Sequence, residues 1–227
     1  NNMNRKPVIA IDGYSSTGKS SISKAVAKAL GLIHLDTGAL YRAVTYYGIE
    51  NFTDENGQLD VPALIENLHR IKLEFKTDEN ELVLFINGRD VSKEIRNLHV
   101  SSLVSLVAKQ PEVRAFLLTA QQTMAKNGGI IMDGRDIGTV VLPDADFKFF
   151  MTASPEERTR RRYKEMLNDG QQVELDEVRE NLLLRDKIDS EREISPLRKP
   201  DGAIVIDNSS LSPQETLAVI LSNLKDF

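Results

Sequence analysis

The stretch GYSSTGKSS at residues 13–21 constrains the fold more than any other part of the chain. It lies between the apolar run PVIAID and the segment ISKAVAKALG, whose apolar residues recur at helical spacing. Gly13, Gly18, Lys19 and Ser20 match the pattern G-x-x-x-x-G-K-[ST]. In this pattern the backbone N–H groups curl around phosphate at a helix N-terminus, the lysine reaches the β- and γ-phosphates, and the serine hydroxyl binds Mg²⁺. We therefore expect ATP to bind at Gly13, Tyr14, Ser15, Ser16, Thr17, Gly18, Lys19, Ser20 and Ser21.

Further short apolar runs predict the rest of a sheet. They lie at residues 32–36, 128–134, 147–152 and 203–208, and turn residues bound each of them. Segments of helical period separate these runs, which indicates an α/β fold: a five-stranded parallel sheet flanked by helices. Gly31 is placed to end the first helix. SPEE at 154–157 and SPQE at 212–215 both predict a helix start with a capping box.

Residues 60–100 break this pattern. Ile71, Leu73 and Phe75 alternate with polar residues, and the apolar run ELVLFING follows after the polar turn KTDEN. NGRD at 87–90 is a further hairpin signal. We therefore predict a small inserted subdomain at 60–100 with a short antiparallel sheet, within a core formed by 1–59 and 101–227.

Composition excludes several classes of protein. The chain has 29 basic and 34 acidic residues, a net charge of −5, which argues against a dedicated binder of nucleic acid or of an anionic membrane. It has no cysteine, which excludes disulfides and thiolate metal sites. No run approaches the roughly 20 apolar residues of a membrane span, and the first residues lack the apolar core of a secretory signal. We expect a cytoplasmic monomer.

Phosphate-binding loops of this kind occur in switches, motors and kinases. The guanine-reading sequence N-K-x-D of GTPase switches does not occur, and the strand GGIIM is followed by DGRD rather than by the D-E of motors. Arginine, which recognises phosphate through two hydrogen bonds at once, is abundant downstream. The arginines concerned are Arg114, Arg135, Arg158, Arg160, Arg161, Arg162, Arg179, Arg185 and Arg192. This supply favours a protein that holds two phosphorylated ligands and moves a phosphoryl group between them.

Four motifs together resemble the bacterial cytidylate kinases, a family of P-loop nucleoside monophosphate kinases. They are IDGYSSTGKSS, LDTGALYR (35–42), DGRDIGTVVLPDAD (133–146) and LRDKIDSERE…PL (184–197), in the family's order and spacing. The resemblance extends from about Pro7 to the last helix. It implies transfer of the γ-phosphoryl group of ATP to CMP or dCMP with Mg²⁺, an enlarged monophosphate-binding subdomain, and a helical lid at about 154–175. Tyr14 departs from the family, which usually has proline there.

The resemblance also implies roles for individual residues. Ser105, Arg114 and Asp136 would line the cytosine pocket, and Asp133 would position Mg²⁺ through water. The CMP site as a whole would contain Thr37, Tyr41, Arg42, Ser105, Arg114, Asp133, Arg135, Asp136, Arg185, Asp189 and Arg192. Catalysis would depend on Lys19, Arg135, Arg158, Arg162 and Arg192. Arg158, Arg161 and Arg162 are spaced to share one face of the lid helix.

Two alternatives remain open at this point. The chain could be another small-molecule P-loop kinase, acting on UMP, AMP or shikimate, or an ATP-gated binding protein with slow hydrolysis. His34, His69 and His99 have no ligand spacing, so we assign them no role.

Overall fold

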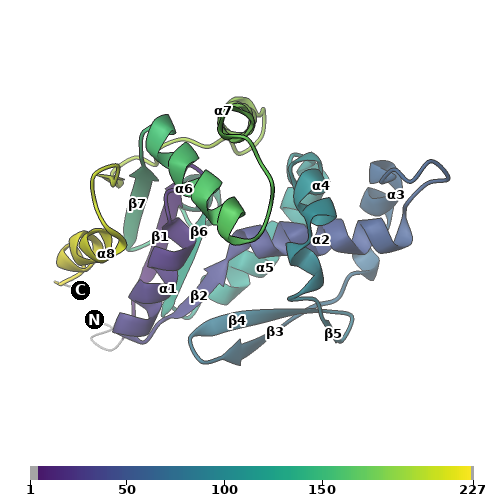
Figure 1. The fold of residues 1–227 in the computed structure, drawn as a ribbon. Helices are drawn as coiled ribbons and strands as arrows, with labels where there is room; N and C mark the ends of the chain where they lie inside the picture. The colour runs from purple at the N-terminus through teal and green to yellow at the C-terminus, as the bar shows by residue number, and fades with distance from the viewer. Residues whose placement is uncertain (1–4, 226–227) are drawn as a thin grey trace.

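The computed structural model describes residues 5–225 (Figure 1). The strands are β1 (Val8–Gly13), β2 (Ile33–Asp36), β3 (Leu73–Asp78), β4 (Glu81–Ile86), β5 (Arg89–Asp90), β6 (Ile130–Gly134), β7 (Phe147–Thr152) and β8 (Ile204–Asp207). The α-helices are α1 (Lys19–Leu30), α2 (Thr37–Asn51), α3 (Val61–Glu66), α4 (Leu98–Ala108), α5 (Pro111–Ala125), α6 (Pro155–Asn168), α7 (Leu175–Glu191) and α8 (Pro213–Ser222). Two short 3₁₀ helices, η1 (Leu68–Arg70) and η2 (Glu94–Arg96), and one π-helical turn, η3 (Ile137–Val141), complete the elements.

The predicted parallel sheet is confirmed. Its strands are ordered β2-β6-β1-β7-β8, and every neighbouring pair among them is parallel. Strand β1 lies in the middle, and its residues Val8–Gly13 are all buried. The carboxyl ends of parallel strands share one edge of a sheet, so the loops that follow β1, β2, β6 and β7 are brought together there.

Helices cover both faces of the parallel strands. Along β1, Ile9 and Ile11 belong to the apolar cluster formed with α1 and α8, whereas Val8 and Ala10 belong to the cluster formed with α2, α4 and α5. Successive side chains of a strand point to opposite faces, so a strand covered on both faces reads as a continuous apolar run. Figure 1 shows α1 and α8 side by side at one side of the sheet.

The antiparallel strands form at the predicted place, but they extend the main sheet instead of forming a separate one. Strand β3 pairs with β4 from Leu73↔Ile86 to Asp78↔Glu81, and β5 folds back onto β4. The turn between β4 and β5 uses Asn87 and Gly88 at φ of 50° and 80°, as the NG signal predicts. Strand β4 then pairs with β2 at His34↔Glu81.

Helix ends follow the sequence signals with two exceptions. Gly31 ends α1 in the left-handed conformation, and Ser212 with Glu215 forms the expected capping box. The capping box predicted at SPEE (154–157) was wrong. The Ser154 hydroxyl accepts a hydrogen bond from the Glu157 N–H, but the Glu157 carboxylate binds arginines of its own helix instead of the Ser154 N–H. The segment LHVSSLVSLVAKQPEVRAFLLTAQQTMA at 98–125, whose apolar residues recur at helical period, also divides into two helices, α4 and α5, because Pro111 begins a new helix.

Helices α6 and α7 contact each other and lie over the edge formed by the loops (Figure 1). Within residues 5–225, no helix has both the length and the apolar character that crossing a membrane requires.

Candidate active site

The loop between β1 and α1 is curled by its own residues. A Cβ atom on Gly13 would lie 2.2 Å from the carbonyl oxygen of Met151 on β7, so only glycine fits at this position. Ser16 and Gly18 have positive φ angles of 60° and 82°, and the Thr17 hydroxyl donates to the Tyr14 carbonyl at 2.9 Å. These contacts turn the chain sharply at the N-terminus of α1, the arrangement in which backbone N–H groups bind phosphate.

A cleft of about 480 Å³ lies beside this loop, at the carboxyl edge of the sheet. Most of the predicted site residues line it: Ser15, Ser16, Gly18, Lys19, Ser20, Ser21, Thr37, Tyr41, Arg42, Ser105, Arg114, Asp133, Arg135, Asp136, Arg162, Arg185, Asp189 and Arg192. Of the predicted residues, Gly13, Tyr14, Thr17 and Arg158 do not belong to this lining in the described part of the chain. The structure thus brings together residues up to 177 positions apart in sequence, from Ser15 to Arg192.

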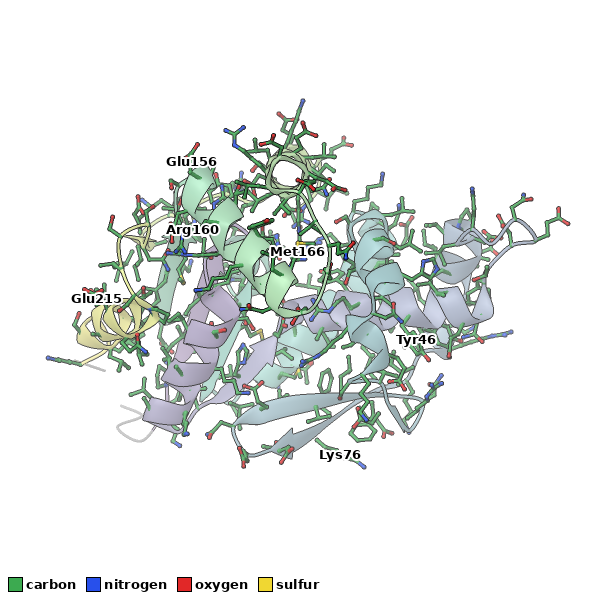
Figure 2. The ribbon with its side chains drawn as sticks, in the orientation of Figure 1. Tyr46, Lys76, Glu156, Arg160, Met166 and Glu215 are labelled. Atoms are coloured by element: carbon green, nitrogen blue, oxygen red, sulfur yellow. The ribbon has the colours of Figure 1, made fainter. Side chains whose placement is uncertain are left out.

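The cleft wall includes residues that sequence reasoning did not select. Asp36, Lys109, Glu165, Met166 and Asn181 are among them. Met166, labelled in Figure 2, comes from the same helix as Arg162 and contributes an apolar surface. No described cleft residue belongs to the segment 60–100. This segment reaches the site indirectly, because its Glu81 contacts His34, which in turn contacts Asp133.

One part of the wall pairs a buried arginine with a buried aspartate. Arg114 Nη2 lies 2.5 Å from Asp136 Oδ2, and Arg114 Nη1 donates to the Ala108 carbonyl at 2.8 Å. The guanidinium also lies over the ring of Tyr41, 4.9 Å from its centroid. Burial raises the pKa of Tyr41 to about 12. Together with Ser105, these groups present hydrogen-bond donors and acceptors at the cleft wall.

A second set of charges is centred on Asp189 of α7. Arg135 Nε donates to Asp189 Oδ2 at 2.6 Å, and Arg192 Nη1 lies 4.0 Å from Asp189 Oδ1. Arg192 is the residue directly after α7, and its Nε donates to the Ser195 carbonyl at 2.8 Å. Asp189 therefore holds two arginines at the cleft.

Several positively charged side chains of the cleft wall lie close enough to repel one another. Burial and the charge of Arg135 lower the pKa of Lys19 to about 7. The charge of Arg135, followed by burial, lowers the pKa of Arg185 to about 10. The charges of Arg162 and Arg42 also lower the pKa of Arg185. Cations that repel one another in a protein are favourable for binding a polyanion, which would relieve that repulsion.

Three arginines of α6, predicted to share one face, reach three different places. Arg158 pairs with Asp186 of α7 at 2.8 Å and lies over the ring of Tyr14, and these three residues line a second pocket rather than the cleft. Arg161 donates to Asn208. Arg162 lines the cleft, and its nearest acidic partner is Glu165 at 3.7 Å.

Comparison with known proteins identifies the family. The family model described as cytidylate kinase matches residues 9–226. A cytidylate kinase of Bacillus cereus (strain G9842) is 47% identical over 221 residues, covering 97% of this chain and 96% of that protein. One of Bacillus thuringiensis (strain Al Hakam) is 45% identical over 219 residues, covering 96% of each. The chain belongs to the cytidylate kinase family. It is therefore a nucleoside monophosphate kinase, a transferase.

A solved structure supports the fold alone. An uncharacterised protein from Eubacterium ventriosum aligns with a TM-score of 0.53 at 12% identity, covering 98% of this chain and 100% of that one. The fold of this cytidylate kinase family member thus occurs in a protein of very different sequence.

Asp12 is a residue of this family member that sequence reasoning missed. It is fully buried, and its two carboxylate oxygens accept hydrogen bonds from the Ile137 and Gly138 N–H groups at 2.8 and 2.7 Å. It thereby ties the end of β1 to η3, the turn that follows Arg135 and Asp136. The sequence signal for Asp12 was a single carboxylate in an apolar strand. A buried charge needs hydrogen-bond partners, so such a residue is expected to hold another segment in place.

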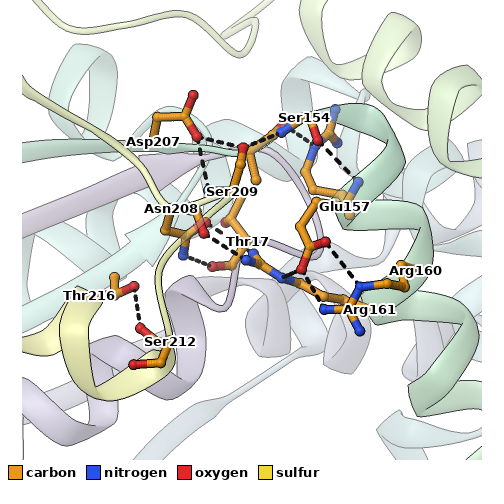
Figure 3. A network of polar contacts seen from close by, with 12 residues as sticks. Thr17, Ser154, Glu157, Arg160, Arg161, Asp207, Asn208, Ser209, Ser212 and Thr216 are labelled. Atoms are coloured by element: carbon orange, nitrogen blue, oxygen red, sulfur yellow. Dashed lines mark hydrogen bonds and ion pairs between the residues drawn. The ribbon is translucent and has the colours of Figure 1, made fainter.

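Asn208 joins the phosphate loop to α6, as Figure 3 shows. Its Nδ2 donates to the Thr17 carbonyl at 2.9 Å, and its Oδ1 and backbone carbonyl accept from Arg161 at 3.0 and 2.8 Å. Glu157 holds the other side of Arg161 at 3.2 Å. Asn208 directly follows β8 at the carboxyl edge of the sheet, and this position is the sequence signal that could have identified it as a site residue.

His34, to which the sequence spacing assigns no role, lies against the predicted metal carboxylate. Its Nε2 is 2.5 Å from Asp133 Oδ1, and its Nδ1 is 3.0 Å from Glu81 Oε1. Burial alone would lower the pKa of His34, but the hydrogen bonds and charges of the two carboxylates outweigh it and raise the pKa to about 9. The Asp133 carbonyl also accepts from the Thr37 hydroxyl at 2.8 Å.

Proposed function

We propose that this chain transfers the γ-phosphoryl group of ATP to CMP and dCMP, giving ADP with CDP or dCDP. One observation carries the proposal: a single cleft is lined both by the phosphate loop and by Ser105, Arg114 and Asp136. ATP bound at the loop and a pyrimidine at that trio would place their phosphates among the crowded cations between them. Membership of the cytidylate kinase family supports the choice of CMP.

Lys19 and the cleft arginines would provide most of the catalysis. The phosphate of CMP is already anionic near neutral pH, so in-line attack on the γ-phosphorus needs no general base. What the protein must supply is alignment of the two nucleotides and stabilisation of the charge on the transferring group. Arg135 and Arg192 are held by Asp189, and Lys19 donates to the Tyr14 carbonyl of the phosphate loop at 3.5 Å. Arg162 would be carried by the lid helix.

The residues present fit a Mg²⁺ ion that arrives with ATP. Ser20 and Asp133 both line the cleft and offer hard oxygen atoms, the donors that Mg²⁺ prefers alongside water and substrate phosphates. Ser20 would bind the ion directly, and Asp133 would hold it through water. The bound ion would neutralise charge on the phosphates.

The sugar and the acceptor phosphate have separate candidate partners. Arg185 and Asp189 would contact the ribose, and Thr37, Arg42 and Arg135 the CMP phosphate, with Tyr41 packed beside it. Residues 154–175 would act as the lid, and residues 60–100 would support the CMP side of the cleft. We also propose that the protein acts as a monomer in the cytoplasm on these two nucleotides.

The test is release of ADP from ATP and Mg²⁺ in a coupled assay, with CMP, dCMP, UMP, AMP, GMP and shikimate added in turn. We expect strong stimulation by CMP and dCMP and weak stimulation by the others. Stimulation by UMP, AMP or shikimate instead would indicate another small-molecule kinase. ADP release that no acceptor changes would indicate an ATP-gated binding protein.

A further inference from the structure

The least expected polar contact is a chain of three side chains, Glu81–His34–Asp133, of which only Asp133 lines the cleft among the described residues. His34 is 2% exposed and lies on β2, between the neighbouring strands β4 and β6 of the same sheet. Each of its ring nitrogens faces a carboxylate, at 2.5 Å on the Asp133 side and 3.0 Å on the Glu81 side. A ring held from both sides has one orientation, and it fixes the orientation of the carboxylate it contacts.

The same three residues join the antiparallel hairpin to the core. Glu81 begins β4, and His34↔Glu81 is the pair through which β2 and β4 meet. The His34 N–H donates to the Asn80 carbonyl at 2.8 Å, and Asn80 Nδ2 donates to the Leu32 carbonyl at 3.2 Å. Backbone and side chain thus fix the end of the hairpin at His34.

Asp133 is left with one oxygen for another partner. Among the described residues, the hydrogen bond to its carboxylate comes from His34 and reaches Oδ1. Asp133 also lines the cleft beside the phosphate loop. A carboxylate that is held at one oxygen and open to the cleft at the other is suited to hold a metal-bound water in a fixed direction.

We propose that His34 is a positioning residue that directs Asp133 toward the Mg²⁺ of bound ATP, and that Glu81 of the hairpin holds His34 in place. This inference rests on the proposed function, which places Mg²⁺·ATP in the cleft. It gives the segment 60–100 a part in the site although none of its described residues lines the cleft. A histidine that only fills the core would make no difference between ATP with and without its metal.

The experiment compares His34→Gln with His69→Gln, the same substitution at an exposed histidine. Calorimetry measures ATP binding once with Mg²⁺ and once with EDTA. For His34→Gln we expect about a 10-fold loss of affinity for ATP with Mg²⁺ and little change in EDTA, because partners of metal-site carboxylates act on metal affinity. In activity assays, the free Mg²⁺ concentration at half-maximal rate should rise while KM for CMP stays the same. His69→Gln should leave every value unchanged.

Glu81→Gln provides the second variant, and it removes a charge from the far side of His34 without touching Asp133. We expect a smaller loss in the same direction, again only with Mg²⁺ present. Thermal unfolding of each variant shows whether it is folded. If His34→Gln does not fold, the binding comparison is made with Glu81→Gln instead.

Equal losses with Mg²⁺ and with EDTA, or no loss in either, would overturn the inference. Failure of the proposed function is distinguishable from this. It would appear in the unaltered protein as ADP release indifferent to CMP, whereas the binding comparison uses ATP alone.

Discussion

Two arginines of this molecule make nearly the same ion pair in different surroundings. Arg114 lies 2.5 Å from Asp136, with side chains 7% and 8% exposed, and Arg160 lies 2.6 Å from Glu157, with side chains 61% and 21% exposed. The distances barely differ, so they say little about energy. Burial determines the energetic contribution of each pair. Water competes for the exposed pair and screens it, whereas loss of one partner of the buried pair leaves a charge that nothing solvates.

The difference separates two kinds of arginine at the site. Arg114 is fixed by Asp136, by the Ala108 carbonyl and by the Tyr41 ring before any ligand binds. Among residues 5–225, the one acidic partner of Arg162 is Glu165 at the long distance of 3.7 Å, and both side chains are exposed. A fixed arginine suits recognition, since ordering it costs no entropy on binding. A loosely held one on a lid helix can move onto a transferring phosphoryl group.

The largest effect is expected from Arg114→Ala, which leaves Asp136 buried and unpaired. We expect the free energy of unfolding to fall by about 3–5 kcal/mol, measured by urea denaturation. The double variant Arg114→Ala with Asp136→Ala should recover part of that loss, because neither charge of the pair is then left buried without its partner. A loss below about 1 kcal/mol in the single variant would mean that water reaches the pair and that burial does not distinguish it from Arg160.

Arg162→Ala tests the opposite case, a large effect on rate with none on stability. If Arg162 reaches the transferring phosphoryl group, kcat should fall on the order of 100-fold, the usual cost of removing one transition-state donor. KM for CMP should change little, and the denaturation midpoint should stay the same because the pair with Glu165 is exposed. A normal kcat would show that Arg162 does not act in the reaction.

Arg161→Ala tests the middle of the series. Its side chain is 25% exposed, and it binds both Asn208 and Glu157. We expect a loss of about 1–2 kcal/mol in unfolding free energy, because hydrogen bonds to a charged group are lost at a partly exposed site. Because Asn208 also holds the Thr17 carbonyl, KM for ATP should rise several-fold. Arg161→Lys should restore little, since lysine lacks the planar fork that reaches two acceptors of Asn208. Full restoration by lysine would assign Arg161 a charge effect only.

These arginines also show how far the sequence predicts the site. The phosphate loop and the parallel strands were predictable because their signals are local: two glycines with restricted backbone angles, and apolar runs bounded by turns. The partners of Arg158 and Arg161 were not, because they come from α7 and from the end of β8. Helical spacing places side chains on a face, but a long side chain selects among partners that the tertiary structure supplies.

His34 shows the same limit more sharply. Its partners Glu81 and Asp133 are 47 and 99 residues away in the sequence. No spacing rule connects them, and only the strand order β4-β2-β6 brings them into line. The resemblance to cytidylate kinases could not supply the contact either, since it passes on only the residues of its motifs.

Arg160→Ala should have the smallest effect and is the internal standard for the series. Its pair with Glu157 is an exposed i,i+3 contact within α6, so we expect a change of no more than about 0.5 kcal/mol in unfolding free energy. Raising the salt concentration should shrink even that difference, because exposed charges are screened. Arg160 also donates two hydrogen bonds to Glu157, whose carboxylate holds Arg161 as well. A loss above about 1 kcal/mol would therefore mean that Glu157 transmits the change to Arg161 and Asn208, and that the exposed arginine belongs to the network of Figure 3 in energy as well as in position.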